Sequence, residues 1–173
     1  MITRMVHVPT ALLLVAVLLS SCHSFYSFKG ISIDDRTKTF YVAPFEVSPS
    51  VNNIEQNYTQ TLAERLKDKI RTESSLTYSS TDPHVEFTGT VVKYRISNEA
   101  PQDDQTVAFA RLTIGISLDY TDHIDETKSW TKNFEIFANY DPNESLGSIQ
   151  SELIREINDG LVENIFNDAF TQW

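Results

Sequence analysis

The chain has 173 residues, with 24 acidic against 14 basic residues and a formal net charge of −10. This acidic balance disfavours binding to a phosphate backbone or direct adsorption to anionic lipids, so we expect no nucleic-acid partner. Cys22 is the single cysteine, which excludes a disulfide within the chain.

The N-terminal residues have the pattern of a secretory leader. Arg4 precedes an apolar run over residues 11–19, which is about half as long as a bilayer-spanning helix and matches the apolar region of a signal peptide. The small residues Ser20 and Ser21 follow, and then Cys22, an order that looks like a bacterial lipobox. We therefore expect cleavage after residue 21 and acylation of Cys22, with several acyl chains giving a durable anchor.

Other roles for Cys22 remain open from its context. A lone cysteine in an exported protein could form an intermolecular disulfide or stay a free thiol. A catalytic cysteine would need an activating base and a rigid scaffold, which a position just after a leader does not offer. His23 rather than an aspartate follows the cysteine, and this favours the outer membrane.

The chain divides into three predicted parts. Residues 1–21 form the cleaved leader, residues 22–38 a lipidated tether, and residues 39–173 one folded domain. A tether this short would hold the domain close to the membrane.

The first half of the domain predicts a strand and then a helix. Residues 39–47 are rich in β-branched and aromatic side chains, although Pro44 suggests an edge position or a bulge. Apolar residues at helical spacing then predict a helix over about residues 54–72, which Asn53 and Gln56 would begin with a capping box.

The second half predicts three strands and a final helix. Alternation predicts strands over residues 85–96, 106–120 and 127–140, with a bulge or tight bend near Gly89. The "DPNE" segment at residues 141–144, with Asp141 as the N-cap and Pro142 at the first helical position, then predicts a helix running to about residue 169.

The order β-α-β-β-β-α predicts an α+β fold. We expect a two-layer sandwich with both helices on one face of a four-stranded mixed sheet. The first and second strands would form a parallel crossover, and the opposite sheet face would be left polar.

No motif in the sequence indicates catalysis. The histidines lack the spacing of metal ligands, and a nucleophile elbow, a zinc-protease motif and a glycine-rich phosphate loop are all missing from the sequence. We therefore expect no enzyme activity, no cofactor and no metal.

Basic residues on the strands are the remaining candidates for a binding site. They could form a positive stripe across the sheet, and Arg111, Lys93 and Lys132 are the candidate contacts for an anionic ligand. The alternative is that they are solvent-facing and paired with nearby acids, which contributes little to stability. The full set is Lys93, Arg95, Arg111, Lys128 and Lys132.

Segments along the whole mature chain resemble one family, the LPS-assembly lipoproteins called LptE. The similarity is to a divergent branch in which Tyr-Ser-Phe-x-Gly follows the lipid-bearing cysteine. The segments are "YSFKGISI" after Cys22, "KTFYVAPFEV", "LKDKI", "FTGTVVKYRI", "ARLTIGISLDY" and "LIREINDGLVENIFND".

This resemblance implies a role and partners. It implies a helices-on-sheet domain that plugs the outer-membrane β-barrel LptD, on the periplasmic side, and assists lipopolysaccharide insertion into the outer membrane. Its implied partners are an LptD-type barrel, lipopolysaccharide and the outer membrane itself. Two other functions stay open from the residues: a free-standing outer-membrane lipoprotein that binds a glycan or lipid, and a lipid-anchored hydrolase.

Overall fold

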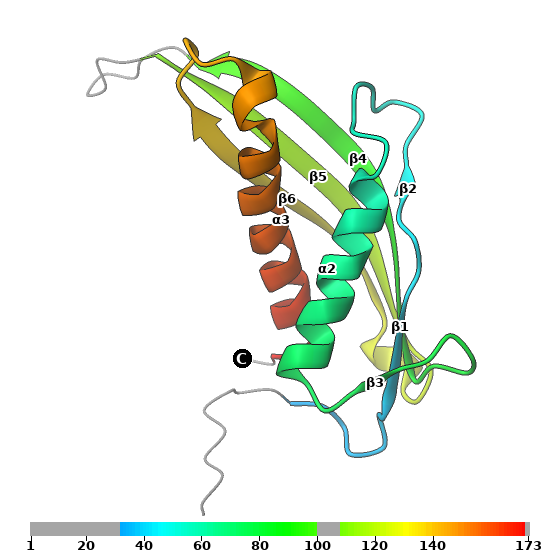
Figure 1. Ribbon diagram of the computed structural model, residues 1–173. Coiled ribbons are helices and arrows are strands. Elements are labelled where there is room, and N and C mark those ends of the chain that lie inside the picture. The colour runs from blue at the N-terminus through cyan, green and yellow to red at the C-terminus, as the bar shows by residue number, and fades with distance from the viewer. Residues whose placement is uncertain (1–31, 100–107, 172–173) are drawn as a thin grey trace, which may run out of the picture. The chain divides into compact units, whose positions relative to one another are not determined.

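The computed structural model describes residues 32–99 and 108–171 (Figure 1). Cys22 and most of the predicted leader and tether therefore lie outside the described residues. In chain order the elements are β1 (Thr39–Val42), β2 (Glu46–Val47), α2 (Tyr58–Glu73), β3 (Thr77–Tyr78), β4 (Val85–Glu99), β5 (Phe109–Asp122), the 3-10 helix η1 (Glu126–Lys128), β6 (Trp130–Tyr140) and α3 (Leu146–Phe170).

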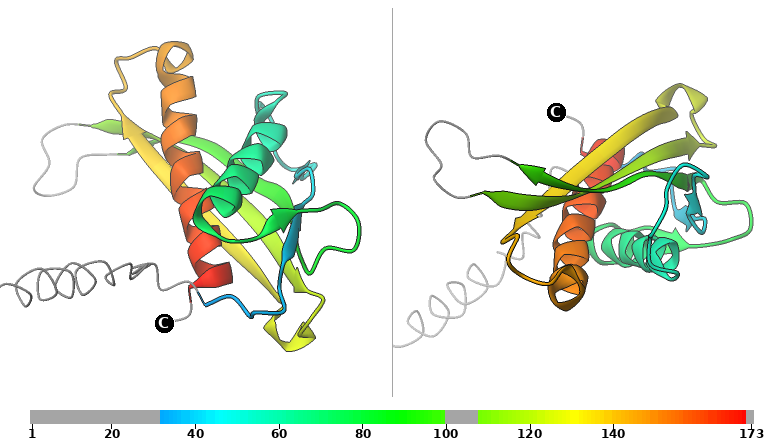
Figure 2. Two further views of the ribbon diagram at one scale, coloured as in Figure 1. Left: turned by 60° about the horizontal axis from the view of Figure 1, so that its bottom comes forward. Right: turned by 90° about the horizontal axis from the view of Figure 1, so that it is seen from above.

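One mixed sheet organises the fold. Its strands lie in the order β3-β1-β4-β5-β6, and β2 pairs with β4 further along from β1. Strands β1 and β2 run parallel to β4, whereas β4, β5 and β6 form an antiparallel meander. Both helices pack on the same face of the sheet, as Figure 2 shows. The predicted α+β sandwich with two helices on a mixed sheet is confirmed.

The sheet has six strands rather than four for two local reasons. Pro44 has no backbone N–H to donate, so the predicted first strand is divided into β1 and β2, both of which pair with β4. The two-residue strand β3 was not predicted, because so short a pairing leaves no periodic pattern. The predicted irregularity in β4 is present, and it lies between Val91 and Lys93.

Gly89 lies where β4 passes the interruption between β1 and β2. A Cβ atom at this position would lie 3.0 Å from the ring of Phe45, which is itself buried. The missing side chain thus lets Phe45 pack directly on the β4 backbone and cover the core there.

The apolar core lies between the sheet and the two helices. Every second residue of β5 contributes to the centre of the core, and these residues are completely or almost completely buried, as the alternation predicts. They are Ala110, Leu112, Ile114, Ile116, Leu118 and Tyr120. Helix α2 adds Leu62, Leu66 and Ile70, and α3 adds Ile157, Leu161 and Ile165, so each helix buries one apolar stripe.

Both helices begin later than predicted. Helix α2 starts at Tyr58, because Asn53 adopts a left-handed conformation (φ 63°) and forms no capping box with Gln56. Helix α3 starts at Leu146, since Asp141 instead closes a turn by accepting the backbone N–H of Asn143 at 2.8 Å. The predicted caps are therefore wrong, although both helices are present.

One polar pair joins the helices inside the core. The Tyr58 hydroxyl donates to Oδ1 of Asn158 at 2.7 Å, and both side chains are buried. Nδ2 of Asn158 has no hydrogen-bond partner within the described part of the chain. This amide thus depends on Tyr58 for its one side-chain hydrogen bond.

The substitution Tyr58→Phe should lower the free energy of unfolding by about 1–3 kcal/mol, because it leaves the buried Asn158 amide entirely unsatisfied. The double variant Tyr58→Phe/Asn158→Leu should recover most of that loss, since two apolar partners leave no polar group to desolvate. Urea unfolding of the three proteins measures both effects. A double variant less stable than Tyr58→Phe would contradict this assignment.

Candidate functional site

The sheet face opposite the helices is covered by neither α2 nor α3 (Figure 2), and the residues that strand register places on it are mostly polar. We call this surface the open face; strand register places its members on one side of the sheet. Most carry hydroxyl, amide or charged groups; Phe109 and Phe137 are the large apolar exceptions, and Phe137 is the more exposed of the two. The open face comprises Glu86, Thr88, Thr90, Lys93, Arg95 and Ser97 on β4, Phe109, Arg111, Thr113, Gly115, Ser117, Asp119 and Thr121 on β5, and Thr131, Asn133, Glu135, Phe137 and Asn139 on β6.

Arg111 lies on the open face, as the alternation of its strand predicts. Its Nε donates to Oδ1 of Asn139, the residue directly opposite on β6, at 2.9 Å. Its guanidinium carbon also lies 4.0 Å from the ring centroid of Phe137, within cation–π range. Phe137 is 50% exposed, so the stacked pair is presented to a binding partner.

Lys93 reaches across the middle strand of the meander. Its Nζ lies 2.8 and 2.9 Å from the two carboxylate oxygens of Glu135 on β6. The side chain passes over Gly115, the residue between them in the register, where a Cβ atom would lie 3.0 Å from the Cβ of Lys93. Glycine at this position therefore makes room for the ion pair.

Arg95 lies between Lys93 and Ser97 on β4 and is exposed. Within residues 32–99 and 108–171 no carboxylate lies within ion-pair distance of its guanidinium. Register places Arg95, Lys93 and Arg111 in successive rows of the open face, so these three cations lie at one end of it.

The structure does not bring the other two predicted cations to this cluster. Lys132 has the parity of the core-facing residues of β6, and its Nζ bonds Asp168 of α3 at 2.8 Å. Lys128 lies on η1, with its Nζ 3.6 Å from Asp34 and 3.7 Å from Asp125. The predicted five-residue stripe is therefore a cluster of three.

Residues 37–169 match the model of the LptE family, described as lipopolysaccharide-assembly. The chain belongs to the LptE family. The resemblance read from the sequence is thereby confirmed over most of the chain.

Solved structures with low sequence identity share the fold. Protein XCC0632 from Xanthomonas campestris is 9% identical, with a TM-score of 0.51, and the match covers 80% of this chain and 91% of that one. The hypothetical protein CT253 from Chlamydia trachomatis is 8% identical, with a TM-score of 0.50 and coverage of 77% and 98%. The comparison with curated proteins finds no match.

LptE-family membership places this chain in lipopolysaccharide assembly. The family consists of non-enzymatic lipoproteins of the outer membrane. Neither of the helices described, α2 or α3, is both long and apolar enough to cross a bilayer. Where residues are described, no three potential metal-ligating side chains of histidine, cysteine, aspartate or glutamate gather into a candidate site.

Proposed function

We propose that this LptE-family protein is an outer-membrane lipoprotein, anchored through acylated Cys22, that plugs the lumen of an LptD-type β-barrel. In that position it assists assembly of the barrel and insertion of lipopolysaccharide into the outer membrane. The family match supports the lipopolysaccharide pathway, and the open face is the structural observation that supports a barrel as the partner.

The chemistry of the open face fits the wall of a barrel lumen. The inside of a large outer-membrane barrel is polar, unlike an obligate hydrophobic interface. Threonine, serine and asparagine side chains on β4, β5 and β6 can exchange hydrogen bonds with water for hydrogen bonds with such a wall. Phe137 and the stacked Arg111 supply the aromatic and arginine contacts that carry binding energy in many interfaces.

We further propose that Lys93, Arg95 and Arg111 contact phosphate groups of lipopolysaccharide. Guanidinium groups bind phosphate oxygens in a bidentate manner, and two of the three cations are arginines. Lys132 lies on the helix side of the sheet, so it would contact a different part of the ligand from these three residues.

The double variant Arg95→Ala/Arg111→Ala should weaken lipopolysaccharide binding at least about tenfold, because two charge-assisted contacts are removed. Its free energy of unfolding should change by less than about 1 kcal/mol, since both side chains lie at the surface. Binding to purified lipopolysaccharide is measured beside the control Arg155→Ala, a charge loss on the exposed surface of α3. Equal affinity of the double variant and the control would remove these residues from the proposal.

Depletion of the protein in its own cell tests the function itself. The amount of folded LptD-type barrel in the outer membrane should fall, and newly made lipopolysaccharide should fail to reach the cell surface. A plasmid copy should restore both, whereas a Cys22→Ala copy should not, because it lacks the anchor. Normal barrel levels and normal surface lipopolysaccharide after depletion would refute the proposed function.

A further inference from the structure

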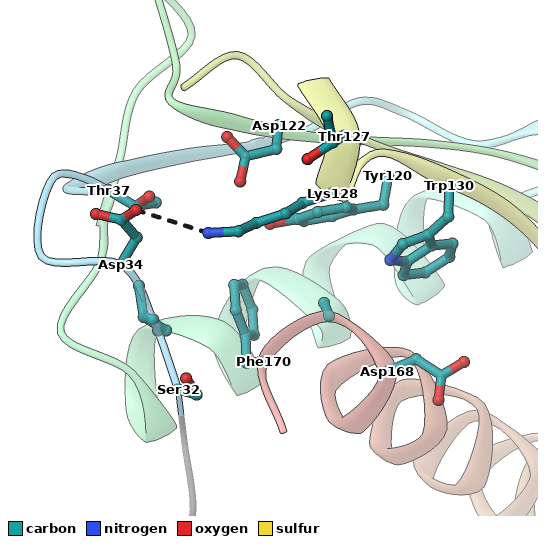
Figure 3. Close-up of a pocket in the computed structure, with 12 residues that line it drawn as sticks. Ser32, Asp34, Thr37, Tyr120, Asp122, Thr127, Lys128, Trp130, Asp168 and Phe170 are labelled. Carbon is teal, nitrogen blue, oxygen red and sulfur yellow. Dashed lines mark ion pairs between the residues drawn. The ribbon is translucent and has the colours of Figure 1, made fainter. Parts of the chain in front are cut away.

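A cavity of about 410 Å³ lies at the Tyr120–Trp130 end of the β5–β6 pair, and strand register places Arg111 at the other end. Figure 3 shows the residues that line the cavity. Its walls come from residues 32–37 ahead of β1, the β5–η1–β6 hairpin and the last turn of α3. The backbone N–H of Ser32 donates to the carbonyl of Phe170 at 2.8 Å, which fixes the incoming chain against α3. The volume is in the range of small-molecule binding sites.

Two hydroxyl groups of largely buried residues line this cavity, and both oxygens are open to it. Tyr120 is 6% exposed and Thr37 is 4% exposed, and neither hydroxyl has a hydrogen-bond partner in the described parts of the chain. Burial raises the pKa of the Tyr120 phenol far above its usual value, so the hydroxyl stays protonated and can both donate and accept. Hydroxyls that open to a cavity can exchange hydrogen bonds with water for hydrogen bonds with a ligand, so these two groups are available to hold one.

Aromatic side chains line the cavity beside the Tyr120 and Thr37 hydroxyls. The Trp130 ring stacks on Tyr120, with ring centroids 5.3 Å apart and an interplanar angle of 21°. Its indole N–H is a donor that bonds no side chain or backbone group in the described structure, and Trp130 also lines the cavity. Phe170 packs edge-on against Tyr120 at 6.4 Å. Aromatic surface therefore lies next to the unused polar groups.

The acidic groups of the cavity, in contrast, already have partners. An additional ion would have to displace an existing ion pair or a backbone hydrogen bond, at a cost in desolvation. The pairs are Asp34 with Arg36 at 2.7 Å, Asp168 with Lys132 at 2.8 Å, and Asp122 with the backbone N–H groups of Ile124 and Asp125 at 2.8 and 2.9 Å. The cavity groups that no other described residue bonds are thus the neutral ones, Tyr120, Thr37 and Trp130, and they suit a neutral ligand.

We propose that this cavity binds a neutral saccharide unit, held by the Tyr120 and Thr37 hydroxyls and flanked by the Trp130 ring. Sugar hydroxyls donate and accept hydrogen bonds at once, which matches two hydroxyl groups and an indole N–H around an aromatic surface. Lys128 extends toward Asp34 across this space, and its ammonium makes no hydrogen bond with the described residues, so it can donate to a sugar oxygen (Figure 3). This site is separate from the open face and does not depend on a barrel partner.

The sugar could be a free glycan or the headgroup of a glycolipid. Residues 22–31 separate Cys22 from the cavity wall, and ten residues span at most about 35 Å. If Cys22 carries the anchor, the cavity stays within that reach of the membrane surface, where glycolipid headgroups are exposed.

Saturation-transfer NMR on the full-length lipidated protein, in micelles without sugar headgroups, tests the assignment. The probes are glucose, galactose and N-acetylglucosamine oligosaccharides as free glycans, and rough lipopolysaccharide as a glycolipid. The double variant Thr37→Val/Tyr120→Phe removes both hydroxyls with little change in shape. Tyr41→Phe is the matched control, since it removes a tyrosine hydroxyl outside the cavity.

Sugar protons of at least one probe should receive saturation, and the double variant should raise the dissociation constant about 10- to 30-fold while Tyr41→Phe leaves it unchanged. Saturation of free glycans would show that the sugar alone is sufficient for binding. Saturation of the sugar protons of the glycolipid alone would show that the ligand is the headgroup of a membrane glycolipid. The proposal is overturned if no sugar proton receives saturation, if only acyl protons do, or if the double variant binds as the wild type does. The double variant should still co-purify with the barrel, which separates this test from that of the proposed function.

Discussion

Replacement of Phe137 by aspartate should reduce recovery of an LptD-type barrel with this protein at least about tenfold. Phe137 is half exposed on a mostly polar surface, and Arg111 stacks on its ring. Aspartate at this position would remove the aromatic surface from the middle of the contact, and its carboxylate would pair with the neighbouring Arg111 and withdraw that side chain from the barrel. Quantitative affinity purification from membranes measures the barrel recovered for each molecule of the tagged protein.

The control for this prediction is Ile96→Asp. Ile96 is similarly exposed and lies near Phe137 along the sheet, but register places it on the helix side, with Leu112. This variant should retain most of the barrel, because its side chain does not project from the open face. Equal losses of barrel in the two variants would show that aspartate at any exposed apolar position weakens recovery. The open face would then not be the surface that contacts the barrel.

Phe87→Ala should lower the free energy of unfolding by about 3–5 kcal/mol, a large part of the 5–15 kcal/mol typical of a domain. Phe87 is fully buried, and its ring contacts those of Tyr120 and Phe170 at centroid distances of 5.2 and 6.0 Å. Truncation would leave a cavity where β4, β5 and α3 meet. Urea unfolding, with Phe137→Ala as a control expected to lose less than about 1 kcal/mol, measures the difference. Similar losses of unfolding free energy in Phe87→Ala and Phe137→Ala would contradict the central position of Phe87 in the core.

The fold was largely predictable because its longest strands alternate cleanly. On β5 the even-numbered residues from Ala110 to Tyr120 are buried, and Arg111 faces the other way. Period-2 alternation is a property of each strand by itself, so it is visible without tertiary information. The same holds for the apolar stripes of α2 and α3, whose spacing follows the helical repeat.

Features set by the local backbone were less predictable. Asn53 was expected to cap a helix, but it takes a left-handed conformation and the helix starts four residues beyond the predicted residue 54. The side of the sheet on which Lys132 lies could have been predicted from the sequence, because Lys132 alternates in phase with Trp130 and Phe134 on β6. That alternation places Lys132 on the helix side, whereas its charge alone suggested the polar face.

The cavity had no signal in the sequence. Thr37, Tyr120 and Phe170 come from three distant segments, and their proximity depends on how β1, β5 and α3 meet at one end of the domain. A tyrosine in an alternating strand is predicted to be buried, but whether its hydroxyl finds a partner depends on tertiary packing. Such a site becomes visible only when the segments are assembled.

Purification of the full-length, lipidated protein from outer membranes, followed by identification of its stable partners, tests the proposed function most directly. We predict an LptD-type β-barrel in near-equal amount with the tagged protein, still bound after size-exclusion chromatography. The reciprocal purification through the barrel should return this protein. Repeated recovery of the protein alone, from membranes in which the barrel is present, would contradict its role as a plug.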